Sequence, residues 1–241
     1  MRRATATTPV LCRAPDLTAL AEAAATDLAD RIACVIDTRG LCRVALAGGT
    51  TPRPVYERIA RSDLAARIDW TRVDLFFGDE RCVPPDDEAS NYRMVEQALV
   101  ARLGAKPRVH RIAGEEPPAD AARAYAAEMG DAPLDVVVLG MGGDGHTASL
   151  FPGRPEAQER SARVVPARAP TPPVERVSLT LRAINEAGAV RFWVSGEDKA
   201  ARVAEVFREI ESGAPALPAA QVWPESGELI WFLDDAAARR L

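Results

Sequence analysis

The chain has 241 residues, of which 47% are hydrophobic and 27% are charged, and its formal net charge is −5. These values are typical of a globular protein with a substantial core, and one domain is the better expectation for an α/β chain of this length. The acidic balance argues against a general nucleic-acid binder, which needs a basic face to replace the counterions of the phosphates, so any phosphate recognised is expected to be small and local.

The first predicted element is an amphipathic helix from Asp16 to about Asp37, where apolar residues recur at three- and four-residue steps. A short buried strand is predicted at Cys42 to Gly48, followed by a glycine turn and a helix from Pro54 to Ala60. The same order returns in RVDLFFGDE, with a helix from about Asn91 to Ala101, and LDVVVLGMGGDG begins a third unit. Three strand-to-turn units therefore organise the first two thirds of the chain.

Further strands are predicted in RVSLTL (Arg176 to Leu181), AVRFWVS (Ala189 to Ser195) and ELIWFL (Glu228 to Leu233), with a helix at Asp198 to Ile210. We interpret the proline-rich segment between them and the histidine turn as an extended excursion with a short strand near Val164. We do not interpret it as an interdomain linker, because we expect the strands on either side to be neighbours in one sheet. The pattern predicts a single α/β domain over residues 1–241, with three αβα layers and a doubly wound, largely parallel sheet.

The four cysteines show no C-x-x-C spacing, so the sequence predicts reduced thiols and neither a zinc site nor a disulfide framework. No apolar run approaches the ~18 residues of a membrane span, and the N-terminal MRRATATTPVLCR lacks the apolar core of a secretory signal. We therefore expect a cytoplasmic protein without a membrane partner. The sequence is compatible with a monomer or a small homo-oligomer.

Polar motifs follow three of the predicted strands, and in open α/β sheets ligands bind outside the carboxyl ends of the strands. In the first motif, Gly48 and Gly49 let backbone N–H groups approach a ligand, Thr50 and Thr51 add hydroxyls, and the next helix begins there. This arrangement suits a phosphate. The alternative is a tight strand-to-helix connection with a threonine N-cap and a proline in the first helical turn.

The second motif is FFGDERCVPPDDEASNYRM, which brings Asp79, Glu80 and Arg81 to the end of a strand. Arg81 can clamp an anion there, and a carboxylate can handle protons. The alternative is a surface ion pair followed by a helix capped by Ser90.

The third motif is the glycine-rich turn GMGGDGH, in which Asp144 and His146 lie two residues apart and can aim at one point. A neutral imidazole beside a carboxylate is a candidate general base. The alternative is a helix cap or a structural hydrogen bond. The spacing does not supply the three or four converging ligands of a zinc site, so no metal is expected. The other histidine, His110, is predicted to be a surface or strand-edge residue.

A fourth feature is VSGEDKA, where Lys199 stands near the start of a helix and can meet a phosphate. The alternative is a solvated helix lysine.

Taken together and in order, these motifs resemble the 6-phosphogluconolactonase family of the pentose phosphate pathway. The resemblance rests on AGGTTP, on GDERCVP followed by Ser90 and Asn91, and on GMGGDGHTASLFPG. The RVSLTL strand and the G-x-x-K of Gly196 to Lys199 fit the same order, whereas the residues before Asp16 and the proline-rich excursion carry no signature.

The resemblance implies hydrolysis of 6-phospho-D-glucono-1,5-lactone to 6-phosphogluconate, with no metal or organic cofactor. His146 would activate water, with Asp144 orienting either the imidazole or the substrate. The turn Gly48–Gly49–Thr50–Thr51 and Lys199 would hold the phosphate. Arg81 would serve either the phosphate or the developing oxyanion, Asp79 is a candidate to bind sugar hydroxyls, and Arg176 is a candidate to reach the anion.

The same motifs are compatible with two rival functions. The resemblance extends to glucosamine-6-phosphate deaminase/isomerase, which would want an acidic residue shortly after the histidine, whereas the nearest here is Glu156. The other rival is a non-catalytic sugar-phosphate sensor, against which stand the retained His146 and Asp144 and the lack of room for a DNA-binding segment.

Overall fold

Seven parallel strands form the central sheet of the computed structural model, which describes residues 9–241. The prediction about the N-terminal segment therefore lies partly outside the described residues. In spatial order the strands are β1 (Val10–Ala14), β10 (Glu228–Asp234), β9 (Ala189–Val194), β6 (Val136–Leu139), β2 (Cys42–Leu46), β3 (Val73–Phe77) and β5 (Arg108–Val109).

A second, antiparallel sheet joins β4 (Asp79–Arg81), β8 (Glu175–Leu179) and β7 (Val164–Arg168). The short strand predicted near Val164 is confirmed as β7. The expectation that the strands flanking the excursion are neighbours in one sheet is wrong, because β6 lies in the parallel sheet and β8 pairs with β4 and β7. A strand pattern reports burial and alternation but not the partner, which is chosen by tertiary contacts.

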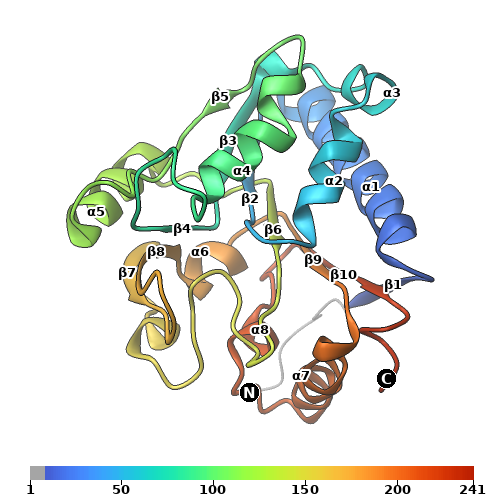
Figure 1. Cartoon of the computed structure of the whole chain (residues 1–241), viewed down its shortest axis with the longest axis vertical. Coiled ribbons are helices and arrows are strands. Elements are labelled where there is room, and N and C mark those ends of the chain that lie inside the picture. The colour runs from blue at the N-terminus through green and yellow to red at the C-terminus, as the bar shows by residue number, and fades with distance from the viewer. Residues whose placement is uncertain (1–8) are drawn as a thin grey trace.

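Helices cover both faces of the parallel sheet. They are α1 (Leu17–Arg39), α2 (Pro52–Ile59), α3 (Ser62–Ala65), α4 (Asn91–Ala98), α5 (Pro118–Met129), α6 (Leu181–Asn185), α7 (Ala200–Ser212) and α8 (Pro218–Gln221). Short 3₁₀ turns are η1 (Trp70–Arg72), η2 (Val100–Arg102), η3 (Pro155–Gln158) and η4 (Glu197–Lys199). Figure 1 shows α1 and α2 on one side of β9 and β10, and α7 and α8 on the other. No helix within residues 9–241 combines the length and the apolar character needed to cross a membrane.

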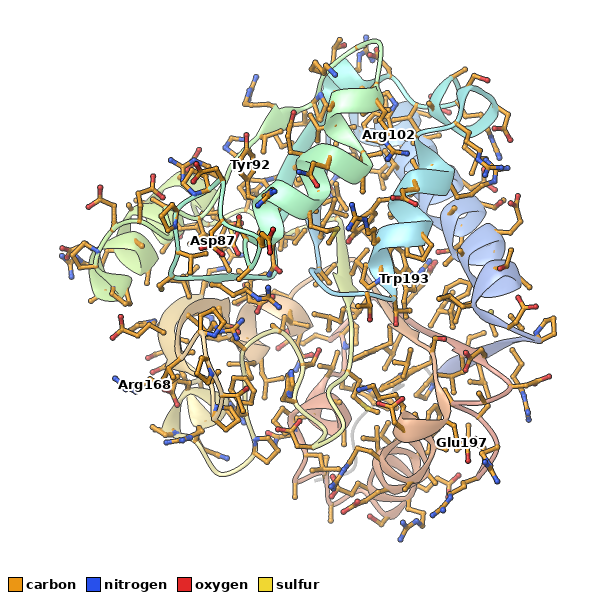
Figure 2. The ribbon with its side chains drawn as sticks, viewed as in Figure 1. Asp87, Tyr92, Arg102, Arg168, Trp193 and Glu197 are labelled. Carbon is orange, nitrogen blue, oxygen red and sulfur yellow. The ribbon has the colours of Figure 1, made fainter. Side chains whose placement is uncertain are left out.

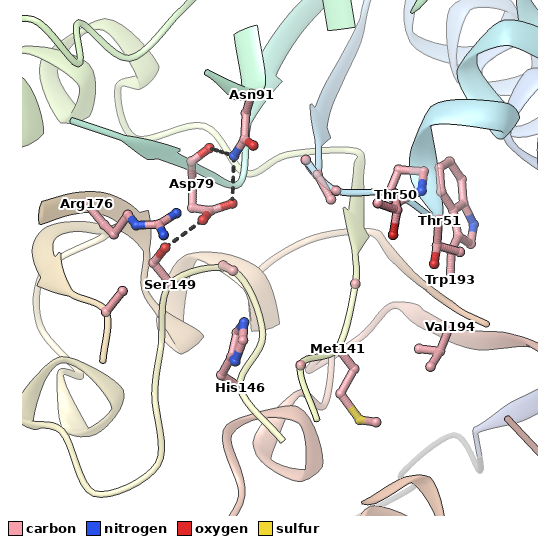
Figure 3. Close-up of a pocket in the computed structure, with 18 of the residues that line it drawn as sticks. Thr50, Thr51, Asp79, Asn91, Met141, His146, Ser149, Arg176, Trp193 and Val194 are labelled. Atoms are coloured by element: carbon pink, nitrogen blue, oxygen red, sulfur yellow. Dashed lines mark hydrogen bonds between the residues drawn. The ribbon is translucent and has the colours of Figure 1, made fainter. Parts of the chain in front are cut away.

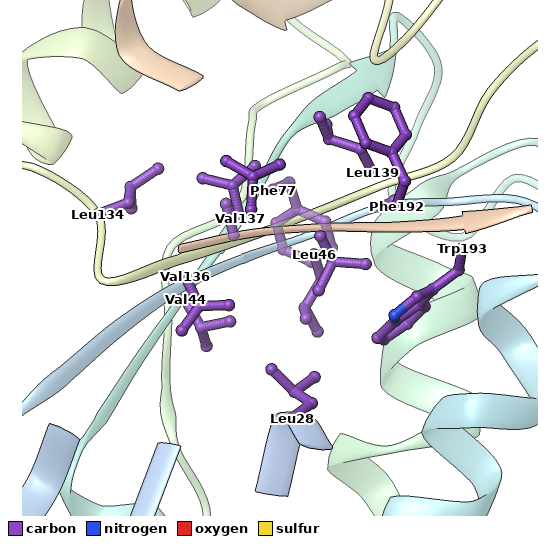
Figure 4. Close-up of a cluster of buried hydrophobic side chains, with 14 of the residues drawn as sticks. Leu28, Val44, Leu46, Phe77, Leu134, Val136, Val137, Leu139, Phe192 and Trp193 are labelled. Atoms are coloured by element: carbon purple, nitrogen blue, oxygen red, sulfur yellow. The ribbon is translucent and has the colours of Figure 1, made fainter. Parts of the chain in front are cut away.

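Every residue of β3, β6 and β9 is buried, as expected for parallel strands covered on both faces. Figure 4 shows Phe192 and Trp193 on opposite sides of β9, with Leu28 of α1 facing the same side as Trp193. In Figure 2, Trp193 lies in the interior, whereas the charged side chains of Arg168 and Glu197 lie at the periphery. The predicted three-layer α/β class with a largely parallel sheet is thus confirmed.

Most predicted helices and strands are found at the predicted residues, with small differences at their ends. The strand predicted to reach Leu181 ends at Leu179, because Thr180 accepts a hydrogen bond from the Ala183 N–H and begins α6. The helix predicted from Asp198 is a 3₁₀ turn followed by α7. Strands β1 and β5 and helices α3, α5, α6 and α8 were not predicted. Asp79 to Arg81, expected at the end of a strand and its turn, form the separate strand β4 of the antiparallel sheet.

The winding of the chain places a crevice between β2 and β6. From β2 the sheet grows through β3 to β5, and the chain then returns to β6 on the opposite side of β2 and continues to β9 and β10. The direction of winding therefore reverses between β2 and β6, and in doubly wound folds ligands bind at such a point, beyond the carboxyl ends of the strands. The glycine turns after β2 and β6 meet there.

Candidate active site

A cavity of about 340 Å³ opens at these strand ends and collects nearly all the predicted site residues (Figure 3). Its lining includes Gly48, Gly49, Thr50, Thr51, Asp79, Arg81, His146, Arg176 and Lys199. Asp144 is the one predicted site residue that does not line it. Within residues 9–241, no group of three or more His, Cys, Asp or Glu side chains is placed to hold a metal ion.

Asp144 instead holds the histidine. Its Oδ1 lies 2.5 Å from the Nδ1 of His146 and also accepts a hydrogen bond from the His146 backbone N–H at 3.1 Å. Burial opposes ionisation of Asp144, but these hydrogen bonds and the adjacent imidazole outweigh it, and the pKa of Asp144 lies below its usual value. With Nδ1 engaged, Nε2 is the nitrogen left for the cavity, since no other described residue hydrogen-bonds it.

Gly142 makes the close approach of this pair feasible. A Cβ at Gly142 would lie 2.1 Å from both Cε1 and Nδ1 of His146 and 2.7 Å from Asp144 Oδ1. The Gly142 N–H also donates to the His146 carbonyl at 2.9 Å, which closes the turn. The imidazole also contacts the ring of Phe151, with the centroids 4.4 Å apart. Gly142, Asp144 and Phe151 together therefore position the ring.

The turn after β2 offers unpaired donors to the cavity. Thr51 stands at the N-cap of α2, and Pro52 begins that helix, but the threonine side chain makes no capping hydrogen bond. Within the described part of the chain, the hydroxyls of Thr50 and Thr51 and the N–H groups of Gly48 and Gly49 have no hydrogen-bond partner. Thr51 and Pro52 thus occupy the positions that the capping interpretation expected, without its side-chain hydrogen bond, and ligand binding by this turn stays a prediction.

Buried tyrosines fix the strand ends from which two of the site loops begin. The Tyr56 hydroxyl donates to the Ala47 carbonyl at 2.8 Å and accepts from the Ala47 N–H at 3.0 Å. The Tyr125 hydroxyl does the same at Phe77, at 3.0 and 2.7 Å. Both tyrosines are buried. Each one satisfies a backbone donor and acceptor where the regular ladder ends.

Asp79 is buried yet lines the cavity, and neutral donors hold both of its oxygens. Ser149 Oγ donates to Asp79 Oδ2 at 2.6 Å, and Asn91 Nδ2 lies 3.3 Å from Oδ1 and 2.9 Å from the Asp79 carbonyl oxygen. Figure 3 shows these three side chains together beside Arg176. This network differs from the surface ion pair considered as the alternative.

Glu80 points away from the cavity and binds the start of α4. It is 2% exposed and accepts hydrogen bonds from the backbone N–H groups of Arg81, Asn91 and Tyr92 and from the Ser90 hydroxyl. Burial raises the pKa of Glu80, while these backbone bonds oppose the rise. The prediction that both carboxylates reach the rim is therefore wrong for Glu80, because successive residues of a strand point to opposite faces. Ser90 caps α4, as the alternative interpretation of this motif expected, and accepts a hydrogen bond from the Arg93 N–H.

Arg81 and Arg176 are paired across two strands, and among the described residues neither forms a salt bridge. They lie directly opposite each other in the β4–β8 ladder and both line the cavity. Each is tied by one bond to a backbone carbonyl, Arg81 to Ala89 and Arg176 to Pro173. Burial, and next the repulsion from Arg81, lower the pKa of Arg176. An anion in the cavity would relieve this repulsion.

Lys199 is the third cation of the cavity. It ends the turn η4 and reaches the site from the carboxyl end of β9. Its ammonium lies 3.1 Å from the exposed carboxylate of Asp198, a bond that costs little to exchange for a ligand.

The sequence did not identify Asn91 as a binding residue or Ser149 as part of the site, although both line the cavity. Trp193 also lines it, from β9. Glu156 and His110 do not line it. The His110 ring follows the edge strand β5, as expected, and stacks on Phe76 with the ring centroids 4.4 Å apart.

Comparisons with known proteins show which family the chain resembles over nearly its whole length. Residues 15–231 match the family described as glucosamine-6-phosphate isomerases/6-phosphogluconolactonase. The chain is 39% identical to human 6-phosphogluconolactonase, over 92% of this chain and 90% of the human protein. It is 37% identical to the 6-phosphogluconolactonase of Streptomyces coelicolor, over 97% and 95% of the two chains. The crystal structure of 6-phosphogluconolactonase from Thermotoga maritima superposes with a TM-score of 0.82 at 30% identity, covering 94% of this chain and all of that one.

Proposed function

The chain belongs to the glucosamine-6-phosphate isomerase/6-phosphogluconolactonase family, and on this premise we propose that it hydrolyses 6-phospho-D-glucono-1,5-lactone to 6-phospho-D-gluconate in the oxidative pentose phosphate pathway. The observation that carries the proposal is the His146–Asp144 pair at a cavity that also holds three cations and a loop of unpaired donors. A base, an anion site and a small cavity are what this hydrolysis requires.

In the proposed reaction, His146 Nε2 takes a proton from a water molecule, and the resulting hydroxide adds to the lactone carbonyl carbon. The tetrahedral intermediate then collapses, the bond to the ring oxygen breaks, and that oxygen takes the proton from the imidazolium. Asp144 stabilises the imidazolium and fixes which nitrogen faces the substrate. A lactone is an activated ester, so positioning and charge stabilisation suffice, and no covalent intermediate is needed.

We assign the phosphate to the Gly48–Thr51 turn and Lys199, and the sugar hydroxyls to Asp79. Arg81 and Arg176 are candidates for the phosphate or for the developing oxyanion. These roles can be separated with unphosphorylated glucono-1,5-lactone. A residue that binds only the phosphate matters for the phosphorylated substrate alone, whereas loss of an oxyanion donor slows both substrates.

The decisive test of the function is acid release from freshly prepared lactone, corrected for spontaneous hydrolysis in a no-enzyme control. We expect wild type to accelerate it, and His146→Ala to lose most of the acceleration while still binding 6-phosphogluconate. Unchanged turnover in His146→Ala would remove the proposed base. Release of ammonia from glucosamine 6-phosphate, without acidification on adding lactone, would instead favour the deaminase. No observation favours that rival, since the required acidic neighbour does not line the cavity.

We further propose that the protein works in the cytoplasm. The four cysteines are unpaired, which suits a reducing compartment. Cell fractionation would test this assignment.

A further inference from the structure

We propose that Ser149 is a positioning residue, which sets the carboxylate of Asp79 to accept a hydrogen bond from the substrate hydroxyl next to the lactone carbonyl. This inference rests on the proposed function and deepens it, because it makes Asp79 the group that selects a hydroxylated lactone. It stands on the bonds around Asp79, which fix both oxygens of a buried carboxylate at the cavity.

The Ser149 hydroxyl is itself fixed. Ser149 is 1% exposed, and its backbone N–H donates to Ser178 Oγ at 3.1 Å. Ser178, fully buried, donates in turn to the Leu179 carbonyl at 2.9 Å. The 2.6 Å bond from Ser149 to Asp79 therefore links the loop after β6 to the ladder of β8 and to the carboxylate on β4. Water cannot readily replace a donor that is shielded in this way.

Asn91 completes the setting from the opposite side. Its side chain donates toward Asp79 and packs against Gly48, where a Cβ would lie 1.8 Å from Asn91 Oδ1. Both donors to the Asp79 side chain are neutral, and within residues 9–241 no cation forms an ion pair with it. A buried carboxylate has room for further donors, since its two oxygens offer about four acceptor sites.

The chemistry of the ligand then decides what Asp79 can meet. The phosphate and the carbonyl of the lactone only accept hydrogen bonds at neutral pH and would be repelled by Asp79, whereas the ring hydroxyls can donate. Asp79 therefore orients the substrate as well as binding it, because it favours hydroxyl groups at its end of the cavity.

The loop that joins His146 to Ser149 indicates which hydroxyl this is. Ser149 follows His146 by three residues, in a tight turn where Leu150 N–H donates to the Thr147 carbonyl at 3.0 Å. Ala148 lies in this turn with a φ of +47°, a left-handed conformation that is strained for a residue with a Cβ. The turn is held on its other side by Thr147 Oγ1, which donates to the Gly140 carbonyl at 2.9 Å. His146, the proposed base for the water that attacks the carbonyl carbon, thus stands three residues before the residue that fixes Asp79, and we therefore assign to Asp79 the hydroxyl on the carbon adjacent to that carbonyl.

The experiment compares kcat/KM for 6-phosphogluconolactone and for its 2-deoxy analogue, in wild type and in Ser149→Ala. We expect wild type to prefer the hydroxylated lactone, and Ser149→Ala to lose roughly 10- to 100-fold with that substrate, as for a hydrogen bond to a charged group, and much less with the 2-deoxy lactone. Thr147→Val is the matched control. It removes one buried hydroxyl bond from the same turn but no donor to Asp79, so any loss should be equal for both substrates.

Equal losses with both lactones in Ser149→Ala would show that Ser149 only supports the loop and would overturn the proposal, as would a wild type that does not distinguish the two lactones. If Ser149→Ala does not fold, Ser149→Cys keeps a similar volume with a weaker donor, and the same change in preference is expected. If wild type hydrolyses the lactone but neither Ser149→Ala nor Ser149→Cys changes the preference between the two lactones, this inference alone is refuted. Wild type that hydrolyses neither lactone refutes the proposed function, and this inference with it.

Discussion

Gly142→Ala is the substitution whose effect on the catalytic pair can be worked most directly from the structure. The added Cβ would lie 2.1 Å from two atoms of the His146 ring, whereas real Cβ contacts essentially never fall below 3.0 Å, so ring and backbone must separate by at least 0.9 Å. The second overlap, 2.7 Å to Asp144 Oδ1, means that the Asp144 carboxylate must shift as well, so the substitution disturbs both members of the pair.

A displacement of this size matters more for catalysis than for stability. A misplacement of ~1 Å in a reacting group can cost about 100-fold in rate, so we expect kcat/KM for the lactone to fall by about that factor. The His146 side chain is 31% exposed and can swing toward solvent, so the overlap can be relieved without repacking the core. The loss in the free energy of unfolding should therefore stay near the low end of the ~1–3 kcal/mol typical of overpacking.

The assay is acid release from the lactone at fixed pH, together with urea unfolding of each variant. Gly143→Ala is the control, because a Cβ at this neighbouring position has no atom within 4 Å and the backbone is not in a left-handed conformation. We expect Gly143→Ala to keep near wild-type activity. Equal activities of the two variants would refute the argument that the missing side chain at Gly142 is what admits the His146–Asp144 pair.

Further predictions concern the other loops. In Gly48→Ala, the new Cβ would lie 1.8 Å from Asn91 Oδ1 in a side chain only 2% exposed, so we expect a loss of ~1–3 kcal/mol in urea unfolding as well as reduced activity; wild-type stability would contradict this. Lys199→Ala should raise KM for the phosphorylated lactone and leave unphosphorylated gluconolactone unaffected, and an unaltered KM would count against a phosphate role. At pH 8, iodoacetamide should label the exposed Cys34 in the native protein and spare Cys42, because burial raises the pKa of the Cys42 thiol; mass spectrometry showing the reverse order would be inconsistent with the fold.

Among the strands, the sequence predicted the fully buried β3, β6 and β9 and missed β1 and β5, which are short and depend on a partner. VVVL of β6 and AVRFWV of β9 are unbroken apolar or buried runs, which is the pattern of a central parallel strand. Strand β1 is short and largely exposed, and it is a strand because Val10 to Ala14 pair with β10, more than 200 residues away in the chain. No local pattern carries that information.

The same distinction explains the site. The glycine turns and the His146–Asp144 pair are local features, so their positions could be predicted from spacing. Ser149 was missed because its partner Asp79 is 70 residues away in sequence, and a serine in a loop has no signature of its own. The orientation of Glu80 away from the cavity could have been predicted, because alternation along a strand sends Asp79 and Glu80 to opposite faces. That signal is weak in β4, a strand of three residues.

The bonds around Asp79 also explain why the polar motifs, far apart in sequence, act as one site. Gly48 in the turn after β2 packs against Asn91, Asn91 donates to Asp79, and Asp79 accepts from Ser149 in the loop that carries the histidine. Glu80 fixes the start of α4 and thereby the position of Asn91. A connected set of buried hydrogen bonds tends to have one arrangement, because displacing any member leaves a neighbour unsatisfied. Side chains of β4 and α4 therefore hold the proposed phosphate loop and the proposed base at a fixed separation. Hydrolysis of a small phosphorylated lactone would require such a geometry, and this network contributes to it as much as the backbone of the sheet does.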